Sequence, residues 1–171
     1  MAALDALATR PVNNAAGAVV EAGGTVDEAG PTGWQTRIAS VTKPLVALAC
    51  LVAVEEGTLG LDAPAGPPGS TVRHLLAHAS GLPFTGATPI ARPGTRRIYS
   101  NTGFEAAADA LAAGTGMTVG AYLAEAVLEP LGMAATDLRG SPAKDAWSTV
   151  ADLARFAREL LVPTLVAPAT L

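Results

Sequence analysis

The amino-acid sequence predicts an α/β (α+β) fold that is mostly helical and carries one β-hairpin near its N-terminus. Three observations lead to this prediction. The 171 residues are enough for one compact unit with a real core, and half of them are apolar although only 4% are aromatic. Alanine supplies much of this apolar content, which favours helices that pack through small side chains. Only two short segments have the composition of strands.

The predicted strands lie near the N-terminus. Residues 15–21 and 25–28 flank a tight glycine turn at Gly23 and Gly24, so we expect them to pair as a hairpin. A short helix is expected within residues 1–10. Because an isolated hairpin is only marginally stable in water, further strands are expected from a continuation outside this chain or from a partner chain.

The strongest helix signal is the nearly all-apolar segment at residues 44–56, which begins with a proline suited to a first turn and is ended by Gly57. A helix that is apolar on every side is expected to be buried. Further helices are predicted at residues 72–78, 103–113, 119–128 and 150–161. Before the last of them, Thr149 and Asp152 have the spacing of a capping box.

These elements are expected to form two parts of one unit. Residues 1–62 hold the hairpin and the buried helix of an α/β part, and residues 63–171 hold a helical part. The net charge of −4 is spread along the chain, which argues against nucleic-acid and membrane partners. Cys50 lies in an apolar run and is expected to be buried. The N-terminus has no basic region before an apolar stretch, so we expect a cytoplasmic location.

Ser40 and Lys43 are the candidate nucleophile and base. A serine hydroxyl is a poor nucleophile until a nearby base takes its proton. A lysine three residues later on a helix lies on the same face, about one turn away. At the start of a helix, backbone N–H groups and the helix dipole also favour a developing negative charge. Ser40 and Lys43 have this spacing, immediately before the apolar helix.

The same spacing also occurs where no catalysis is expected. The chain has only two lysines, and the second, Lys144, follows Ser141 by three residues in a loop that contains glycine and proline. By itself, the Ser40–Lys43 pair is equally typical of a helix cap followed by a lysine whose charged end reaches solvent.

Tyr99 and Asn101 supply further candidate site residues just before a predicted helix. A phenol at this position can relay a proton to and from a serine–lysine pair, and an amide beside it can bind a substrate carbonyl. Taken alone, however, Tyr99 is more typical of a partly buried aromatic residue and Asn101 of a helix cap.

Six motifs in order along the chain resemble the β-lactamase-related serine hydrolase family, which includes class C β-lactamases, D-alanyl-D-alanine carboxypeptidases and family VIII esterases. Several motifs in the same order are far more specific than any single one. They include Ser-Val-Thr-Lys and Tyr-Ser-Asn and lie at residues 38–44, 52–61, 72–83, 93–101, 128–133 and 148–153.

The resemblance implies a serine β-lactamase/DD-peptidase-like fold and a role for each candidate residue. Ser40 would attack a carbonyl and become acylated, and Lys43 would take its proton or hold the charge of the site. Tyr99 would carry protons to the leaving group, and Asn101 would orient the acyl group of the substrate. The main-chain N–H of Ser40 would form half of an oxyanion hole.

Neither a metal nor another cofactor is expected. His74 and His78 have a spacing that can bind zinc on a helix, but the sequence shows neither a glutamate between them nor an evident third ligand. The resemblance instead implies that both belong to a structural segment that packs beneath the site.

The family's third motif, Lys-Thr-Gly or His-x-Gly on a later strand, does not occur before Leu171. We therefore expect the remaining sheet strands, with the second oxyanion N–H, in a C-terminal segment outside this chain or in a second chain. The first functional expectation is an esterase or peptidase-like hydrolase acting on a small-molecule ester or amide. The alternatives are a β-lactamase or penicillin-binding D-alanyl-D-alanine carboxypeptidase, and a non-catalytic relative that binds a ligand or partner.

Overall fold

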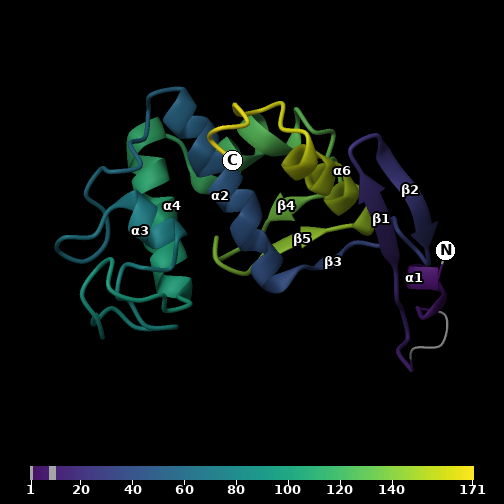
Figure 1. Ribbon diagram of the computed structural model, residues 1–171, viewed down its shortest axis with the longest axis horizontal. Coiled ribbons are helices and arrows are strands. Elements are labelled where there is room, and N and C mark those ends of the chain that lie inside the picture. Colours follow the sequence, from purple (N-terminus) through teal and green to yellow (C-terminus); the bar gives the residue numbers. More distant parts are fainter. Residues whose placement is uncertain (1, 8–10) are drawn as a thin grey trace.

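Helix α2 (Thr42–Glu55) passes through the middle of the molecule, with the β-hairpin on one side and helices α3 (Val72–Leu76) and α4 (Asn101–Thr115) on the other (Figure 1). The structure is a computed structural model that describes residues 2–7 and 11–171. Nine of the 14 residues of α2 are buried, as expected for a helix that is apolar on every side. One of them is Cys50, and burial raises the pKa of its thiol to about 12.

The predicted hairpin consists of β1 (Gly17–Glu21) and β2 (Gly24–Ala29), which pair antiparallel with a bulge between Val19 and Val20. The N-terminal helix, α1, covers Ala2–Asp5, and the rest of its predicted range at residues 1 and 8–10 lies outside the described residues. Helix α6 (Val150–Leu161) lies along the hairpin (Figure 1) and packs mainly on β1.

A second, three-stranded sheet was not predicted from the sequence. It has the order β3-β5-β4, with β3 (Thr36–Arg37) and β4 (Asp137–Leu138) each antiparallel to the central β5 (Ala146–Ser148). The expectation of a single pair of strands was therefore wrong. Strands of two or three residues are too short to show an alternating pattern, and here they pair only because the chain brings distant segments together.

Helix α3 (Val72–Leu76) is shorter than its predicted range, and α4 (Asn101–Thr115) is longer. Helix α3 ends early because the chain turns at His78, whose backbone has a left-handed φ of +59°. A glycine with a φ of +70°, Gly116, ends α4, which is a common way to terminate a helix.

The predicted helix at residues 119–128 is two different helices. It begins as α5 (Val119–Leu123) and continues as the π-helix η2 (Ala124–Leu128). Apolar spacing does not distinguish these backbone patterns over so few residues. Among the described residues, no single helix is long and apolar enough to cross a membrane, whereas α4 and the α5–η2 segment pass the same test as a pair bent by 82°.

The N-terminus of α6 has a cap but not the predicted capping box. Thr149 accepts the N–H of Asp152 at 3.1 Å, as expected for a cap residue. The Asp152 carboxylate does not return to the N–H of Thr149. It is buried and accepts the N–H of Ala135 at 2.9 Å and the hydroxyl of Thr136 at 2.8 Å. The tertiary structure therefore uses this carboxylate to hold the segment before β4.

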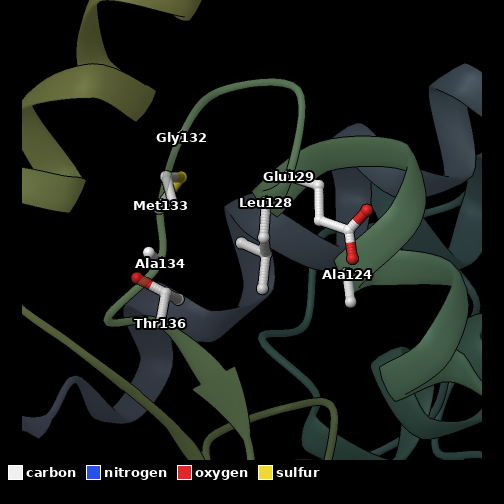
Figure 2. Close-up of a pocket in the computed structure, with 7 residues that line it drawn as sticks. All are labelled: Ala124, Leu128, Glu129, Gly132, Met133, Ala134 and Thr136. Carbon is white, nitrogen blue, oxygen red and sulfur yellow. The ribbon is translucent and has the colours of Figure 1, made fainter.

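An open hollow of about 460 Å³ lies beside η2, between the end of that helix and the segment before β4 (Figure 2). Its lining is mostly apolar, with the carboxylate of one glutamate and the hydroxyl of one threonine. The residues are Ala124, Leu128, Glu129, Gly132, Met133, Ala134 and Thr136. It contains none of the residues that the sequence singled out for catalysis.

Candidate active site

Ser40 lies in a short 3₁₀ helix, η1 (Ala39–Val41), immediately before α2. Ala39 has a φ of +47°, a left-handed conformation that costs a non-glycine residue about 1–2 kcal/mol. The carbonyl of Ala39 accepts the Thr42 hydroxyl at 2.6 Å, which holds this turn closed. Ser40 is exposed, whereas Thr42 and Lys43 just behind it are buried. The strained turn thus presents the serine at the start of a buried helix, as strained residues often do at functional sites.

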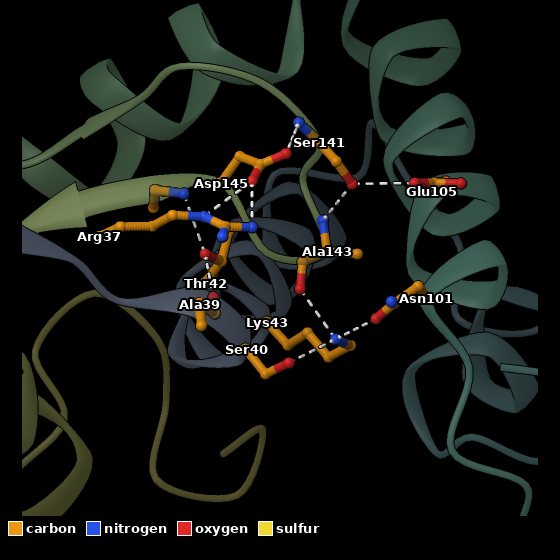
Figure 3. Close-up of polar contacts among 11 residues, drawn as sticks. Arg37, Ala39, Ser40, Thr42, Lys43, Asn101, Glu105, Ser141, Ala143 and Asp145 are labelled. Atoms are coloured by element: carbon orange, nitrogen blue, oxygen red, sulfur yellow. Dashed lines mark hydrogen bonds and ion pairs between the residues drawn. The ribbon is translucent and has the colours of Figure 1, made fainter. Parts of the chain in front are cut away.

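The Lys43 side chain reaches the serine from inside the molecule and is only 3% exposed. Its Nζ donates to Ser40 Oγ at 3.2 Å, to Asn101 Oδ1 at 2.7 Å and to the carbonyl of Ala143 at 2.8 Å (Figure 3). The structure therefore brings together three of the four predicted site residues. The third acceptor of Lys43, the carbonyl of Ala143, belongs to a residue that the sequence did not indicate.

Tyr99 completes the predicted group, with Lys43 Nζ lying 4.6 Å from the centroid of its ring. Burial by itself raises the pKa of Tyr99, but interactions with the Lys43 ammonium and the Ser40 hydroxyl outweigh it, helped by the positive charge of Arg97. The pKa of the phenol therefore lies below its usual value. The ring also stacks on Phe84 with 6.0 Å between centroids.

The segment that carries Tyr99 is held by its neighbour, Ser100. The Ser100 hydroxyl accepts the N–H of Gly103 at 2.8 Å as the N-cap of α4 and donates to the carbonyl of Pro83 at 2.6 Å. Asn101 is thus the first residue of the helix and not its cap, so its amide is available for Lys43. The N–H of Asn101 donates to the carbonyl of Phe84 at 2.9 Å, which fixes the helix start against the preceding loop.

His78 belongs to the site more directly than the sequence indicated. Its Nδ1 accepts the N–H of Ser100 at 3.1 Å, and its ring lies 4.6 Å from that of Tyr99. Burial lowers the pKa of His78, and the charges of Arg97 and Lys43 lower it further, so the neutral imidazole is favoured. Its left-handed backbone is the local feature that places it there, and a sequence does not show such a conformation for a histidine.

His74 and His78 are not placed as a pair of metal ligands. Helix α3 ends before His78, and His74 Nδ1 instead lies 3.2 Å from Thr71 Oγ1 in the capping box of that helix. Within residues 2–7 and 11–171, no group of three or more histidine, cysteine, aspartate or glutamate side chains could hold a metal ion.

An open hollow of about 340 Å³ is lined in part by Ser40 and Lys43. Most of its wall is apolar or aromatic, with a few polar groups, which is the usual composition of a pocket that binds a small molecule. The other lining residues are Pro44, Ala47, Leu76, His78, Tyr99 and Phe104.

A family model of beta-lactamases matches residues 1–171, which is the whole chain. The chain belongs to the beta-lactamase family. The resemblance inferred from the six sequence motifs is thereby confirmed, and hydrolysis is the kind of chemistry found in this family.

Solved structures confirm the predicted fold of this family. A beta-lactamase from Mycobacterium bovis is 53% identical with a TM-score of 0.96, over 98% of this chain and 63% of that one. An octameric penicillin-binding protein homologue from Pyrococcus abyssi is 22% identical with a TM-score of 0.83, over 98% of this chain and 57% of that one. At this lower identity the likeness concerns the fold alone.

A curated relative in sequence is esterase EstB from Burkholderia gladioli. It is 45% identical over a 62-residue alignment, and the match covers 28% of this chain and 16% of the esterase. The chain thus spans less than two thirds of the length of each of these three relatives.

The second serine–lysine pair of this beta-lactamase family chain has no helix to hold it. Ser141 and Lys144 lie in a turn between β4 and β5, with Lys144 exposed and the Ser141 hydroxyl bonded to Glu105 Oε1 at 2.9 Å. The loop nevertheless reaches the site, because it carries the Ala143 carbonyl that Lys43 contacts. Ala143 contributes through its backbone, so no side-chain pattern could have identified it.

Proposed function

We propose that Ser40 is the nucleophile of a serine hydrolase that acts on an ester or amide through an acyl-enzyme. The observation that supports this most directly is the buried Lys43 ammonium group, which lies 3.2 Å from Ser40 Oγ and is held there by two further acceptors. A hydroxyl beside a positioned base is the arrangement that nucleophilic catalysis by serine requires.

In the proposed reaction, the Lys43 ammonium first loses a proton to solvent, and the resulting amine takes the proton of Ser40 as Oγ attacks the substrate carbonyl. The tetrahedral intermediate then expels the alcohol or amine, and Tyr99 delivers the proton that the leaving group needs. The protonated Lys43 then returns its proton to the Tyr99 phenolate. Water attacks the acyl-enzyme and gives a proton to the Lys43–Tyr99 pair, which passes it to Ser40 Oγ as the bond to the acyl group breaks and the acid is released. Because Lys43 occupies Oδ1 of Asn101, the amide NH₂ is the group of Asn101 that would donate to a substrate carbonyl.

Two substrate classes follow from the relatives. The partial likeness to esterase EstB supports hydrolysis of a simple ester or amide, which is our first proposal. The 53% identity to a protein described as a beta-lactamase supports a second proposal, hydrolysis of a β-lactam. Hydrolysis of a D-alanyl-D-alanine peptide belongs to this second proposal through the resemblance of the sequence motifs alone. A non-catalytic relative that binds a ligand in the same hollow is the alternative that an absence of acylation would favour.

The test uses full-length protein with p-nitrophenyl esters, a chromogenic cephalosporin and a fluorophosphonate probe. Substitution Ser40→Ala is expected to abolish turnover and labelling, and peptide mapping of the unsubstituted protein is expected to locate the probe on Ser40. Lys43→Ala is expected to slow acylation by about 10²–10⁴-fold, the usual contribution of a positioned base. Lys144→Ala is the matched control, because this lysine also follows a serine by three residues but is exposed.

The outcomes separate the proposals. Ester turnover that depends on Ser40 supports the first, and cephalosporin turnover that depends on it supports the second. If no probe acylates Ser40 in the folded protein, both hydrolase proposals fail and a binding role remains.

A further inference from the structure

The loop at residues 139–145, between β4 and β5, approaches Lys43 through one backbone atom. Ala143 is fully buried and its carbonyl accepts Lys43 Nζ at 2.8 Å. A hundred residues separate the two along the chain, so this contact depends wholly on how the loop is held. A carbonyl that moves by about an ångström would no longer hold the lysine, and misplacement of that size can cost on the order of 10²-fold in rate.

The loop is linked by hydrogen bonds to helix α4 (Figure 3). The N–H of Ala143 donates to Ser141 Oγ at 3.2 Å, and the Ser141 hydroxyl donates to Glu105 Oε1 at 2.9 Å. Glu105 lies one helical turn after Asn101, which itself accepts Lys43 directly. Helix α4 thus sets two of the three acceptors of Lys43, one directly and one through Ser141.

The loop is also linked, through Asp145, to strand β3, which precedes Ser40. The N–H of Ser141 donates to Asp145 Oδ2 at 3.0 Å, and Arg37 Nη2 lies 2.6 Å from Asp145 Oδ1. Arg37 belongs to β3, three residues before Ser40. Ser141 is therefore the residue at which bonds from the nucleophile strand and from α4 meet.

We propose that Ser141 and Glu105 are positioning residues, which set the place of Lys43 by orienting the carbonyl of Ala143. This role rests on the proposed function of Lys43. It also gives Ser141, the serine of the second serine–lysine pair, a structural task that differs from the one proposed for Ser40. Ser141 accepts one N–H and donates to one carboxylate, so its hydroxyl joins the loop to the helix that carries Asn101. Neither residue touches the substrate or the reacting atoms in this role.

The experiment measures the acylation rate constant and the substrate dissociation constant separately, by pre-steady-state kinetics of full-length protein with a p-nitrophenyl ester. We expect Ser141→Ala to lower the acylation rate constant on the order of 10- to 100-fold with little change in the dissociation constant. Ser141→Thr, which keeps the hydroxyl, is expected to restore most of the rate. Glu105→Ala is expected to behave like Ser141→Ala, and Glu105→Gln, which keeps an acceptor oxygen, to remain near the unsubstituted rate.

The double variant distinguishes a shared path from two separate effects. If Glu105 acts through Ser141, the combined substitution to alanine is expected to slow acylation no more than the worse single one. Asp109→Asn is the control on α4, an exposed acid one turn further along. All rates are taken well below the thermal midpoint of each variant, so that unfolded protein does not contribute.

Two results would overturn the inference while leaving the proposed function intact. One is an unchanged acylation rate in Ser141→Ala, and the other is a double variant whose loss is the product of the single losses. If the unsubstituted protein is not acylated on Ser40 at all, it is the proposed function that fails, and the positioning role fails with it.

Discussion

Lys43 is a cation inside the molecule whose acceptors are uncharged: a hydroxyl, a side-chain amide and a peptide carbonyl. A buried charge is costly unless hydrogen bonds compensate for the lost water. Two aromatic rings add to this compensation, since Nζ lies 4.6 Å from the centroid of Tyr99 and 5.8 Å from that of Phe104. Because its acceptors are uncharged, Lys43 could lose a proton without breaking an ion pair, which is what the role of base that we propose for it requires.

The two tyrosines of the chain have opposite environments. The positive surroundings of Tyr99 lower its pKa despite its partial burial. Burial raises the pKa of Tyr122, and so does the Glu56 carboxylate that accepts its hydroxyl at 2.7 Å. Because the folded pKa of Tyr122 exceeds its unfolded value of about 10, its contribution to stability is complete below that pH and is lost as the pH rises further.

We therefore predict that a spectrophotometric titration of tyrosinate resolves two well-separated steps. Tyr99 is expected to ionise below the usual pH, and Tyr122 only at strongly alkaline pH as the protein unfolds. Tyr99→Phe should remove the first step and leave the second. Lys43→Ala should move the first step to higher pH, because it removes the nearby positive charge. A single step for both tyrosines near pH 10 would contradict these assignments.

Among the elements, the loop at residues 82–98 connects the segment of His78 to that of Tyr99, and a contact between Gly81 and residues 90–91 closes its first part. The N–H of Ile90 donates to the carbonyl of Gly81 at 2.8 Å, and the chain passes so close that a Cβ on Gly81 would lie 2.0 Å from the carbonyl oxygen of Ala91. Gly81 also has a φ of +86°. Both features require glycine at this position.

A pair of glycine substitutions tests this closure. Gly81→Ala adds both an unfavourable φ and a backbone clash, so we expect it to lower the free energy of unfolding by about 2–5 kcal/mol. Gly86→Ala is the matched control in the same loop, with a φ of +106° and nothing nearer to its Cβ than 3.8 Å. It should cost only the backbone term of about 1–2 kcal/mol. Urea unfolding measures both, and equal losses would show that the close approach at Gly81 does not matter.

At the scale of the whole molecule, the carboxylates of two glutamates accept hydrogen bonds from backbone N–H groups of the segment after α6. Glu159 is buried near the end of α6 and accepts the N–H groups of Thr164 and Leu165, both at 2.8 Å. Glu55 at the end of α2 accepts the N–H of Ala167 at 2.8 Å. One carboxylate therefore acts locally, whereas the other joins segments 112 residues apart.

Hydrogen exchange can distinguish the contribution of Glu55 from that of Glu159. We predict that Glu55→Ala speeds exchange of the Ala167 amide by about 10- to 100-fold, the range that corresponds to losing a hydrogen bond to a charged group. The amides of Thr164 and Leu165 should keep their protection in this variant. Glu159→Ala should release those two amides. Loss of protection across the whole segment in Glu55→Ala would mean that it opens as one unit.

The features that could be predicted from the sequence depend on residues close together in the chain. The contact between Ser40 and Lys43 follows from a spacing of three residues at the start of a helix, and the buried position of α2 follows from its continuous apolar composition. The order of the motifs was enough to indicate the family. Element boundaries were less well predicted. The end of α3, for example, depends on the left-handed backbone of His78, a conformation that a sequence usually indicates only at glycine.

The tertiary structure alone decided what surrounds the lysine. The carbonyl of Ala143, the hydroxyl of Ser141 with Glu105, and the imidazole of His78 reach the site from segments far from Ser40 in the sequence. The small sheet β3-β5-β4 that brings the loop at residues 139–145 beside the nucleophile is likewise built from strands too short to predict. The physical reason is common to all of them: backbone groups and single hydrogen bonds between distant segments leave no periodic pattern in the sequence, so their positions are known only once the chain has folded.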